Sequence, residues 1–140
     1  MSKIIILQGV PASGKSTYAR KLHEQNKDYV IVNRDSIRRM RGDYWIPEQE
    51  SYITDIEICC VESALKRGLT PIIDATNLNE AYLELWKDIA EDFEVEIEYI
   101  KFEIGYEEAL LRDANREYPV GKDVIYKFFK KYFPERLPNN

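Results

Sequence analysis

The hydrophobic residues of the chain form short runs separated by longer stretches with helical spacing. Apolar runs at residues 3–7, 29–32 and 71–74 each lead into glycine or polar residues, a pattern that predicts buried strands. Residues 94–102 alternate apolar side chains, Tyr99 among them, with glutamates. This alternation is typical of a half-buried strand that lies towards the edge of a sheet.

Helical spacing marks the stretches between these runs, with apolar residues three and four positions apart on one face. Asn79 suits the N-cap of a helix, because its side chain can accept a hydrogen bond from a backbone N–H of the first turn. The longest helix is expected over residues 48–67, with Tyr52, Ile53, Ile56, Cys59, Cys60 and Leu65 pointing inward. The other expected helices span residues 15–25, 36–41, 106–115 and 122–133 and a segment that follows Asn79.

Strands that alternate with helices predict a three-layer α/β sandwich, with a mostly parallel sheet of about four strands and helices on both faces. The 140 residues contain no internal repeat or linker, so we expect residues 1–140 to form a single domain. Ligands of such sheets bind at the carboxyl ends of the strands. The residues to inspect therefore begin at Gly9, Asn33 and Asp74.

The net charge of −5 is unevenly distributed along the chain. Residues 1–42 carry nine Lys and Arg against three Asp and Glu, whereas residues 43–100 carry three against fifteen. An acidic total argues against a nucleic-acid partner, but a basic first segment allows a short contact with a few phosphates.

The expected location is the cytoplasm of a bacterium or of a phage-infected cell, with no membrane partner. Cys59 and Cys60 are adjacent and unsuited to a disulfide, which fits a reducing compartment. The longest purely apolar run, residues 4–7, is far shorter than a membrane span, and the N-terminus lacks a signal pattern.

Residues 9–16 match the phosphate-binding pattern G-x-x-x-x-G-K-[ST] between a predicted strand and a predicted helix. Backbone N–H groups of such a loop surround phosphate oxygens, and the helix presents its positive end. Lys15 is expected to reach the β- and γ-phosphates of ATP, and the Ser16 hydroxyl to ligate Mg²⁺. The predicted ATP-binding residues of this segment are Gly9, Pro11, Ala12, Ser13, Gly14, Lys15, Ser16 and Thr17.

Asp35 follows the second strand, on the same rim as the phosphate loop. It is either a general base that takes the proton of an acceptor hydroxyl or the N-cap of the helix expected at residue 36. Arg38 lies one turn further, where it can share a face with Asp35 and grip an anionic acceptor. The neighbouring arginines are expected to be solvated or weak acceptor contacts; they are Arg34, Arg39 and Arg41.

The third strand ends at Asp74. An aspartate at the end of an apolar strand resembles the Walker B position, where the carboxylate holds Mg²⁺ through water. Thr76 and Asn77 offer a hydroxyl and an amide that either bind an acceptor phosphate or form an Asx-type turn. Tyr44 and Trp45 either stack on an acceptor base or pack into the core under the next helix.

Arg112 and Arg116 are four residues apart, just before a Tyr-Pro-Val-Gly segment that separates two helices. Such a break can act as a lid that brings arginines onto the γ-phosphate. The alternative is a solvated helix face.

Four segments together resemble the phage-type polynucleotide 5′-hydroxyl kinases. They are GVPASGKST at 9–17, VNRDSIRR at 32–39, IIDATNLN at 72–79 and the R-x-x-x-R of Arg112–Arg116, in the same order as in that family. The resemblance spans nearly the whole chain and implies a P-loop kinase domain.

The resemblance also implies roles for individual residues. Lys15 and Ser16 would contact ATP and Mg²⁺, and Asp35 would be the general base. Arg38 would hold the 3′-phosphate of the acceptor, and Arg116 would contact the transferring phosphate. Further residues implicated in this way are Arg112 at ATP, and Thr76 and Val120 at the acceptor.

We therefore expect an ATP-dependent, Mg²⁺-assisted kinase that phosphorylates 5′-hydroxyl ends of DNA or RNA. A D-x-D-G-[TV] phosphatase motif is absent from the sequence, so no 3′-phosphatase activity is expected. Two alternatives remain. One is a P-loop kinase of a small hydroxyl substrate such as a nucleoside, nucleotide or sugar derivative; the other is a non-catalytic ATP-binding regulator.

Overall fold

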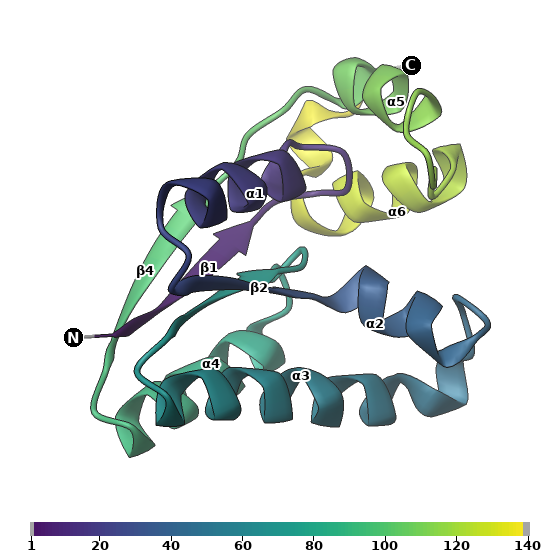
Figure 1. Ribbon diagram of the computed structural model, residues 1–140. Helices are drawn as coiled ribbons and strands as arrows, with labels where there is room; N and C mark the ends of the chain where they lie inside the picture. The colour runs from purple at the N-terminus through teal and green to yellow at the C-terminus, as the bar shows by residue number, and fades with distance from the viewer. Residues whose placement is uncertain (1, 139–140) are drawn as a thin grey trace.

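Strands and helices alternate along the part of the chain that this computed structural model describes, residues 2–138 (Figure 1). The elements are β1 (Lys3–Gln8), α1 (Lys15–Gln25), β2 (Tyr29–Asn33), α2 (Arg34–Arg41), η1 (Pro47–Gln49), α3 (Glu50–Lys66), β3 (Thr70–Asp74), α4 (Glu80–Asp92), β4 (Glu96–Lys101), α5 (Tyr106–Ala114), α6 (Lys122–Tyr132) and η2 (Pro134–Arg136).

The four strands form one parallel sheet in the order β2-β3-β1-β4. β4 is an edge strand, as the alternation of residues 94–102 predicts, although its Tyr99 is exposed. Asp74 is in register with Leu7 on one side and with Asn33 on the other. The carboxyl ends of β1, β3 and β2 therefore lie level at one rim of the sheet.

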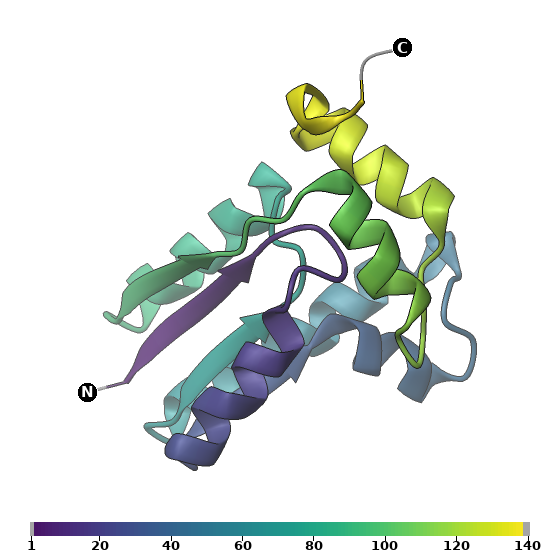
Figure 2. The ribbon, with the colours of Figure 1, turned by 90° about the horizontal axis from the view of Figure 1, so that it is seen from above.

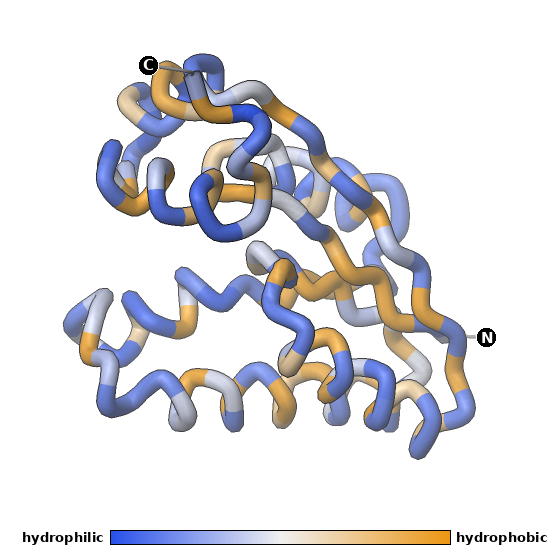
Figure 3. Tube along the Cα trace, turned by 180° about the vertical axis from the view of Figure 1, so that it is seen from behind, coloured by the Kyte–Doolittle hydropathy of each residue, from blue (hydrophilic) through white to orange (hydrophobic). Residues whose placement is uncertain are grey.

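Helices cover both faces of the sheet, which confirms the predicted three-layer α/β sandwich. Successive strand residues point to opposite faces, so Ile5 and Leu7 pack with Ala19 of α1, whereas Ile4 and Ile6 pack with α3 and α4. Figure 1 shows α1 on one side of the strands and α3 and α4 on the other. Hydrophobic residues are concentrated in the central strands, and the outer helices alternate in hydropathy (Figure 3).

The last two helices form a separate small cluster beyond the carboxyl ends of the strands. Ile104, Ala109, Ile125 and Phe129 pack there with Val10, which directly follows the first glycine of the phosphate-loop motif. Figure 2 shows α5 and α6 lying past the tip of β1. The cluster places the α5–α6 loop, residues 115–121, at the rim where the candidate site residues gather.

Two predictions for α2 and α3 are wrong in detail. α2 begins at Arg34, two residues before the predicted start, because the Asn33 side chain caps it by accepting a hydrogen bond from Ser36 N at 2.7 Å. On α3 the expected inward positions include exposed residues, namely Tyr52, Cys59 and Cys60. Glu57, which was not among the expected inward positions, is buried.

A buried ion pair joins α2 to α3. Arg34 was expected to be solvated or a weak acceptor contact, but its side chain is buried and pairs with Glu57. The same guanidinium donates to Thr54 Oγ1 at 3.0 Å and to Glu50 Oε1 at 3.2 Å. Burial raises the pKa of Glu57, and the charge of Arg34 opposes that rise. The pair thus fixes α2 against the N-terminal half of α3.

No helix within residues 2–138 has the length and apolar character that a membrane span requires.

Replacing Arg34 with methionine should lower the free energy of unfolding by about 3–5 kcal/mol, because it leaves Glu57 as a buried carboxylate without its partner. Urea denaturation followed by circular dichroism measures the change. The matched control, Arg20→Met on an exposed position of α1, should change the free energy by less than about 0.5 kcal/mol. An equal loss in the two variants would contradict a stabilising role for the pair.

Candidate active site

The phosphate-loop motif forms a tight turn between β1 and α1. Ala12 and Gly14 both have positive φ angles, 67° and 102°, which turns successive backbone N–H groups inward. Glycine is required at position 9, because a Cβ there would lie 2.6 Å from Ser13 Oγ and 3.0 Å from the Phe102 carbonyl oxygen. Gly14 offers no capping side chain to the first turn of α1, so this helix end suits an anion.

Lys15 is buried at the centre of this turn, with 7% of the residue exposed. Its Nζ donates to the carbonyl oxygens of Gly9 and Val10, at 2.8 and 2.7 Å. Burial lowers the pKa of Lys15 to about 8; the charges of Asp74 and Asp35 oppose this shift, and that of Arg116 adds to it. Asp35, Asp74 and Arg116 therefore all act electrostatically on the same ammonium group.

Asp74 links the phosphate loop to the start of α2. Its buried Oδ2 accepts from Ser16 Oγ at 2.7 Å and from Asn33 Nδ2 at 2.8 Å. The other end of the Asn33 amide caps α2 through Ser36 N. A continuous line of hydrogen bonds thus runs from α1 across the sheet rim to α2.

The oxygen atoms of Ser16 and Asp74 fit a magnesium ion, because Mg²⁺ prefers hard oxygen ligands and retains several waters. Within residues 2–138 there is no group of three or more His, Cys, Asp and Glu side chains that could hold a metal on its own. A metal at this site would therefore take its remaining ligands from water and phosphate.

Asp35 lies in the first turn of α2, so the interpretation of Asp35 as N-cap is wrong: Asn33 occupies that position. Asp35 Oδ1 accepts from Arg38 Nη1 at 2.7 Å and from the Tyr44 hydroxyl at 2.8 Å. Burial raises the pKa of Tyr44 to about 12, and the charge of Asp35 adds to the shift. Tyr44 is therefore a neutral donor that orients the carboxylate.

Arg38 is held between two carboxylates. Its Nε donates to Glu50 Oε2 at 3.0 Å, its Nη2 to Glu50 Oε1, and its Nη1 to Asp35. Burial opposes its charged form, but hydrogen bonding to Glu50 and the nearby negative charges raise the pKa of Arg38 overall. Among the described residues these three bonds use three of its five N–H groups, which leaves two for an acceptor.

Thr76 and Asn77 differ in their surroundings. Asn77 is buried with a φ of 49°, and its Nδ2 donates to the backbone oxygens of Leu7, Ile73 and Ala75. This geometry favours the turn interpretation over acceptor binding for Asn77. The Thr76 carbonyl accepts from Gly9 N at 3.0 Å and so ties this turn to the phosphate loop.

The two arginines of the R-x-x-x-R segment differ in how they relate to the phosphate loop. A Cβ placed on Gly14 would lie 3.9 Å from Arg112 Nη1, and the charge of Arg116 affects the pKa of Lys15. Arg112 is exposed and pairs with Glu108 at 3.1 Å. Arg112 therefore approaches the phosphate loop from α5, whereas Arg116 bonds to Asp113 and acts on Lys15 only through its charge.

Asp113 organises the α5–α6 loop from a buried position. Its carboxylate accepts from the backbone N–H of Val120 at 3.0 Å and of Gly121 at 2.9 Å, and from Arg116 Nη1 at 3.3 Å. Val120, the predicted acceptor contact, packs against the α5–α6 cluster. Asp113 thus holds both Arg116 and the end of the loop.

Two positioning residues, Glu50 and Asp113, were missed in the sequence, and Asn33 was placed at the rim without its role as the cap of α2. Asn33 had a recognisable signal, because asparagine ahead of a helix is a favoured N-cap. Glu50 and Asp113 carry no such sequence signal. Glu50 meets Arg38 only because α2 packs on α3, and Asp113 meets its partners only because the loop after α5 folds back.

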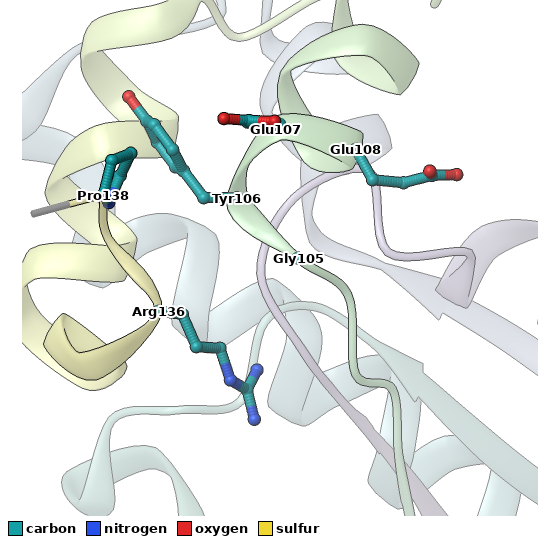
Figure 4. A pocket seen from close by; sticks show the side chains of 6 residues that line it. All are labelled: Gly105, Tyr106, Glu107, Glu108, Arg136 and Pro138. Carbon is teal, nitrogen blue, oxygen red and sulfur yellow. The ribbon is translucent and has the colours of Figure 1, made fainter.

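A shallow pocket elsewhere on the molecule contains none of these site residues (Figure 4). It lies between the N-terminus of α5 and the C-terminal segment. Its lining residues are Gly105, Tyr106, Glu107, Glu108, Arg136 and Pro138.

Comparison with known proteins identifies relatives over most of the chain. A family model described as an AAA domain matches residues 4–132. A protein of Autographa californica nuclear polyhedrosis virus, provisionally named bifunctional polynucleotide kinase/RNA ligase, is 29% identical over 93% of this chain and 21% of its own length. L-seryl-tRNA(Sec) kinase of Methanococcus maripaludis is 27% identical over 92% of this chain and 52% of its own length.

Among solved structures, the Pnkp1/Rnl/Hen1 RNA repair complex contains a chain that superposes with a TM-score of 0.76 and 30% identity. The match covers 98% of this chain and 46% of that one, so the chain spans about half or less of the length of these relatives. The chain belongs to the AAA domain family, as a P-loop domain similar to that of polynucleotide kinases, and the resemblance expected from its motifs is confirmed.

Proposed function

We propose that the chain is an ATP-dependent kinase domain that transfers the γ-phosphate of ATP to the 5′-hydroxyl of DNA or RNA ends. The observation that carries this proposal is the pair formed by Asp35 and Arg38 at the start of α2, which is tied to the phosphate-loop side of the rim through Asn33 and Asp74. A carboxylate and a guanidinium on the same rim suit an alcohol acceptor that carries an adjacent phosphate.

On the donor side, the backbone N–H groups of residues 9–17 would hold the phosphates of ATP. Lys15 Nζ would exchange its bonds to the Gly9 and Val10 carbonyls for β- and γ-phosphate oxygens. Ser16 and Asp74 would hold Mg²⁺, directly and through water. The metal, when bound, neutralises charge on the phosphates.

On the acceptor side, Asp35 would accept the proton of the 5′-hydroxyl as its oxygen bonds to the γ-phosphorus. The bond from that phosphorus to the β–γ bridging oxygen breaks, and ADP leaves. The two remaining N–H groups of Arg38 would hold the 3′-phosphate of the acceptor nucleotide. Arg116 would stabilise the charge on the transferring phosphoryl group, with Arg112 beside the loop.

This assignment uses one domain, residues 1–140, with nucleic acid ends as the partner. The relatives named as polynucleotide kinase and as part of an RNA repair complex support this choice of acceptor. The proposed donor is ATP, and the proposed location is the cytoplasm.

The proposed reaction is tested by incubating the protein with γ-labelled ATP and an oligonucleotide that has a 5′-hydroxyl. Asp35→Asn should lower kcat by about 10²–10⁴-fold, because the general base is lost, while the affinity for ATP stays unchanged by calorimetry. The exposed Asp43→Asn variant is the matched control and should retain wild-type kcat.

Repeating the assay with other acceptors separates the polynucleotide kinase from the alternative functions. Transfer only to free nucleosides, nucleotides or sugars, or to an aminoacylated tRNA as the name of the Methanococcus relative suggests, would replace the polynucleotide assignment. ATP binding without transfer to any acceptor would indicate a regulator. Full activity of Asp35→Asn would remove Asp35 from the role of base.

When ATP binds at mildly alkaline pH, Lys15 should gain a proton from solution. With a pKa of about 8, Lys15 is roughly half neutral at pH 8, and a neighbouring triphosphate favours its charged form. We expect uptake of about half a proton at pH 8 and about a tenth at pH 7. Calorimetry in two buffers with different ionisation enthalpies measures this difference.

The control for proton uptake is Lys15→Arg, because a guanidinium remains charged in both states. When this variant binds ATP at pH 8, the half proton that the wild-type protein takes up should be absent. Equal uptake by wild-type protein at pH 7 and pH 8 would show that Lys15 is not the group that titrates.

A further inference from the structure

Five side chains, alternately aromatic and arginine, form a continuous stack from Trp45, two residues before η1, to the α5–α6 loop. We call this stack the arginine–aromatic ladder; its members in spatial order are Trp45, Arg38, Tyr44, Arg39 and Tyr118. The Arg38 Cζ atom lies 5.5 Å from the Trp45 ring centre and 5.6 Å from that of Tyr44. The Arg39 Cζ atom lies 5.4 Å from Tyr44 and 4.0 Å from Tyr118.

The two end rings of the ladder face solvent. Trp45 is 58% exposed and Tyr118 is 53% exposed, whereas the three inner members are half-buried. The core-packing alternative for Trp45 is therefore wrong. Neither end ring has a part in the proposed phosphoryl transfer, so the transfer does not explain why these two rings are exposed at the rim.

Within the described residues, positive charge at the ladder is left without a carboxylate partner at its member Arg39 and at the neighbouring Arg41, whereas Arg38 pairs with Asp35 and Glu50. Among the described residues, Arg39 and Arg41 form no salt bridge; Arg41 donates instead to the backbone carbonyls of Asp43 and Tyr44, at 2.7 and 3.1 Å. Exposed aromatic rings beside unpaired guanidinium groups are the recognition elements of single-stranded nucleic acid, which they bind through base stacking and backbone phosphates.

The ladder is joined to the acceptor side of the site. Tyr44 donates its hydroxyl to Asp35 at 2.8 Å, and Arg38 belongs both to the ladder and to the pair with Asp35. Trp45 adjoins Arg38 on one side, and Tyr118 lies beyond Tyr44 and Arg39 on the other, so a strand whose first phosphate is held at Arg38 would have an exposed ring on either side of that phosphate. Its following bases would meet the free faces of the end rings.

We propose that the ladder binds the single strand that continues 3′ of the acceptor nucleotide, with bases stacked on Trp45 and Tyr118. The inference rests on the proposed function, because it takes Arg38 as the site of the first phosphate. It adds a length preference: oligonucleotides are better acceptors than nucleoside 3′-monophosphates. Since Tyr118 belongs to the α5–α6 loop, a bound strand also bridges that loop to α2.

Intrinsic fluorescence tests binding without any need for catalysis. The chain has two tryptophans, and Trp86 is buried with 1% exposed, so Trp45 is the tryptophan that a stacked base can reach. Titration with a ten-nucleotide deoxythymidine oligonucleotide should quench the emission, whereas inorganic phosphate should not. Trp45→Phe should abolish the quenching. Absence of quenching in the wild-type protein would overturn the inference, and this includes the case in which the ladder serves a protein partner.

Kinetics test the length preference. In Trp45→Ala and Tyr118→Ala, the ratio of kcat/KM for the oligonucleotide to kcat/KM for a nucleoside 3′-monophosphate should fall about fivefold or more. The matched control is Tyr99→Ala, an exposed tyrosine on the opposite edge strand, which should leave the ratio unchanged.

The outcomes of the two experiments are distinguishable. Quenching of Trp45 without transfer to any acceptor would overturn the proposed reaction while supporting the ladder as a strand-binding surface. Transfer with equal efficiency to long and short acceptors would overturn the ladder and leave the reaction in place. Equal losses on both acceptors in Tyr118→Ala would show that the ring only positions the loop, which also overturns the inference.

Discussion

A single carboxylate oxygen, Oδ2 of Asp74, holds together the parts of the candidate site that come from three different strands. It accepts from Ser16 at the start of α1 and from Asn33 at the end of β2. Because Asn33 also caps α2, the position of Asp35 and Arg38 depends on the same oxygen. The phosphate loop and the start of α2 are thus connected through the rim of the sheet.

Two of the chain's acidic residues hold the arginines of α2 in place. Glu50 and Glu57 come from the acidic middle of the sequence and hold Arg34 and Arg38, which come from the basic first segment. Pairing of this kind fixes the planes of the guanidinium groups and lowers the net charge of the rim. The remaining positive charge is carried by Arg39 and Arg41, beside exposed aromatic rings.

Periodicity and motif spacing were sufficient to predict the order of elements, the parallel sheet and the rim at which the site residues gather. They were insufficient where a tertiary partner decides the outcome. Helical spacing placed Cys59 and Cys60 inward and could not anticipate that Glu57 would be buried by pairing with Arg34. The left-handed backbone of Asn77, whose amide bonds to the carboxyl ends of β1 and β3, likewise depends on the turn that follows β3.

The way in which Asp113 holds the α5–α6 loop has a consequence for sequence variation. Two of its three bonds are to backbone N–H groups, those of Val120 and Gly121, which any residue other than proline would provide. The exposed side chains at residues 117–119 are therefore free to change while the loop keeps its place. Such a loop allows related proteins, or a designer, to alter the side chains presented at this rim without displacing Arg116.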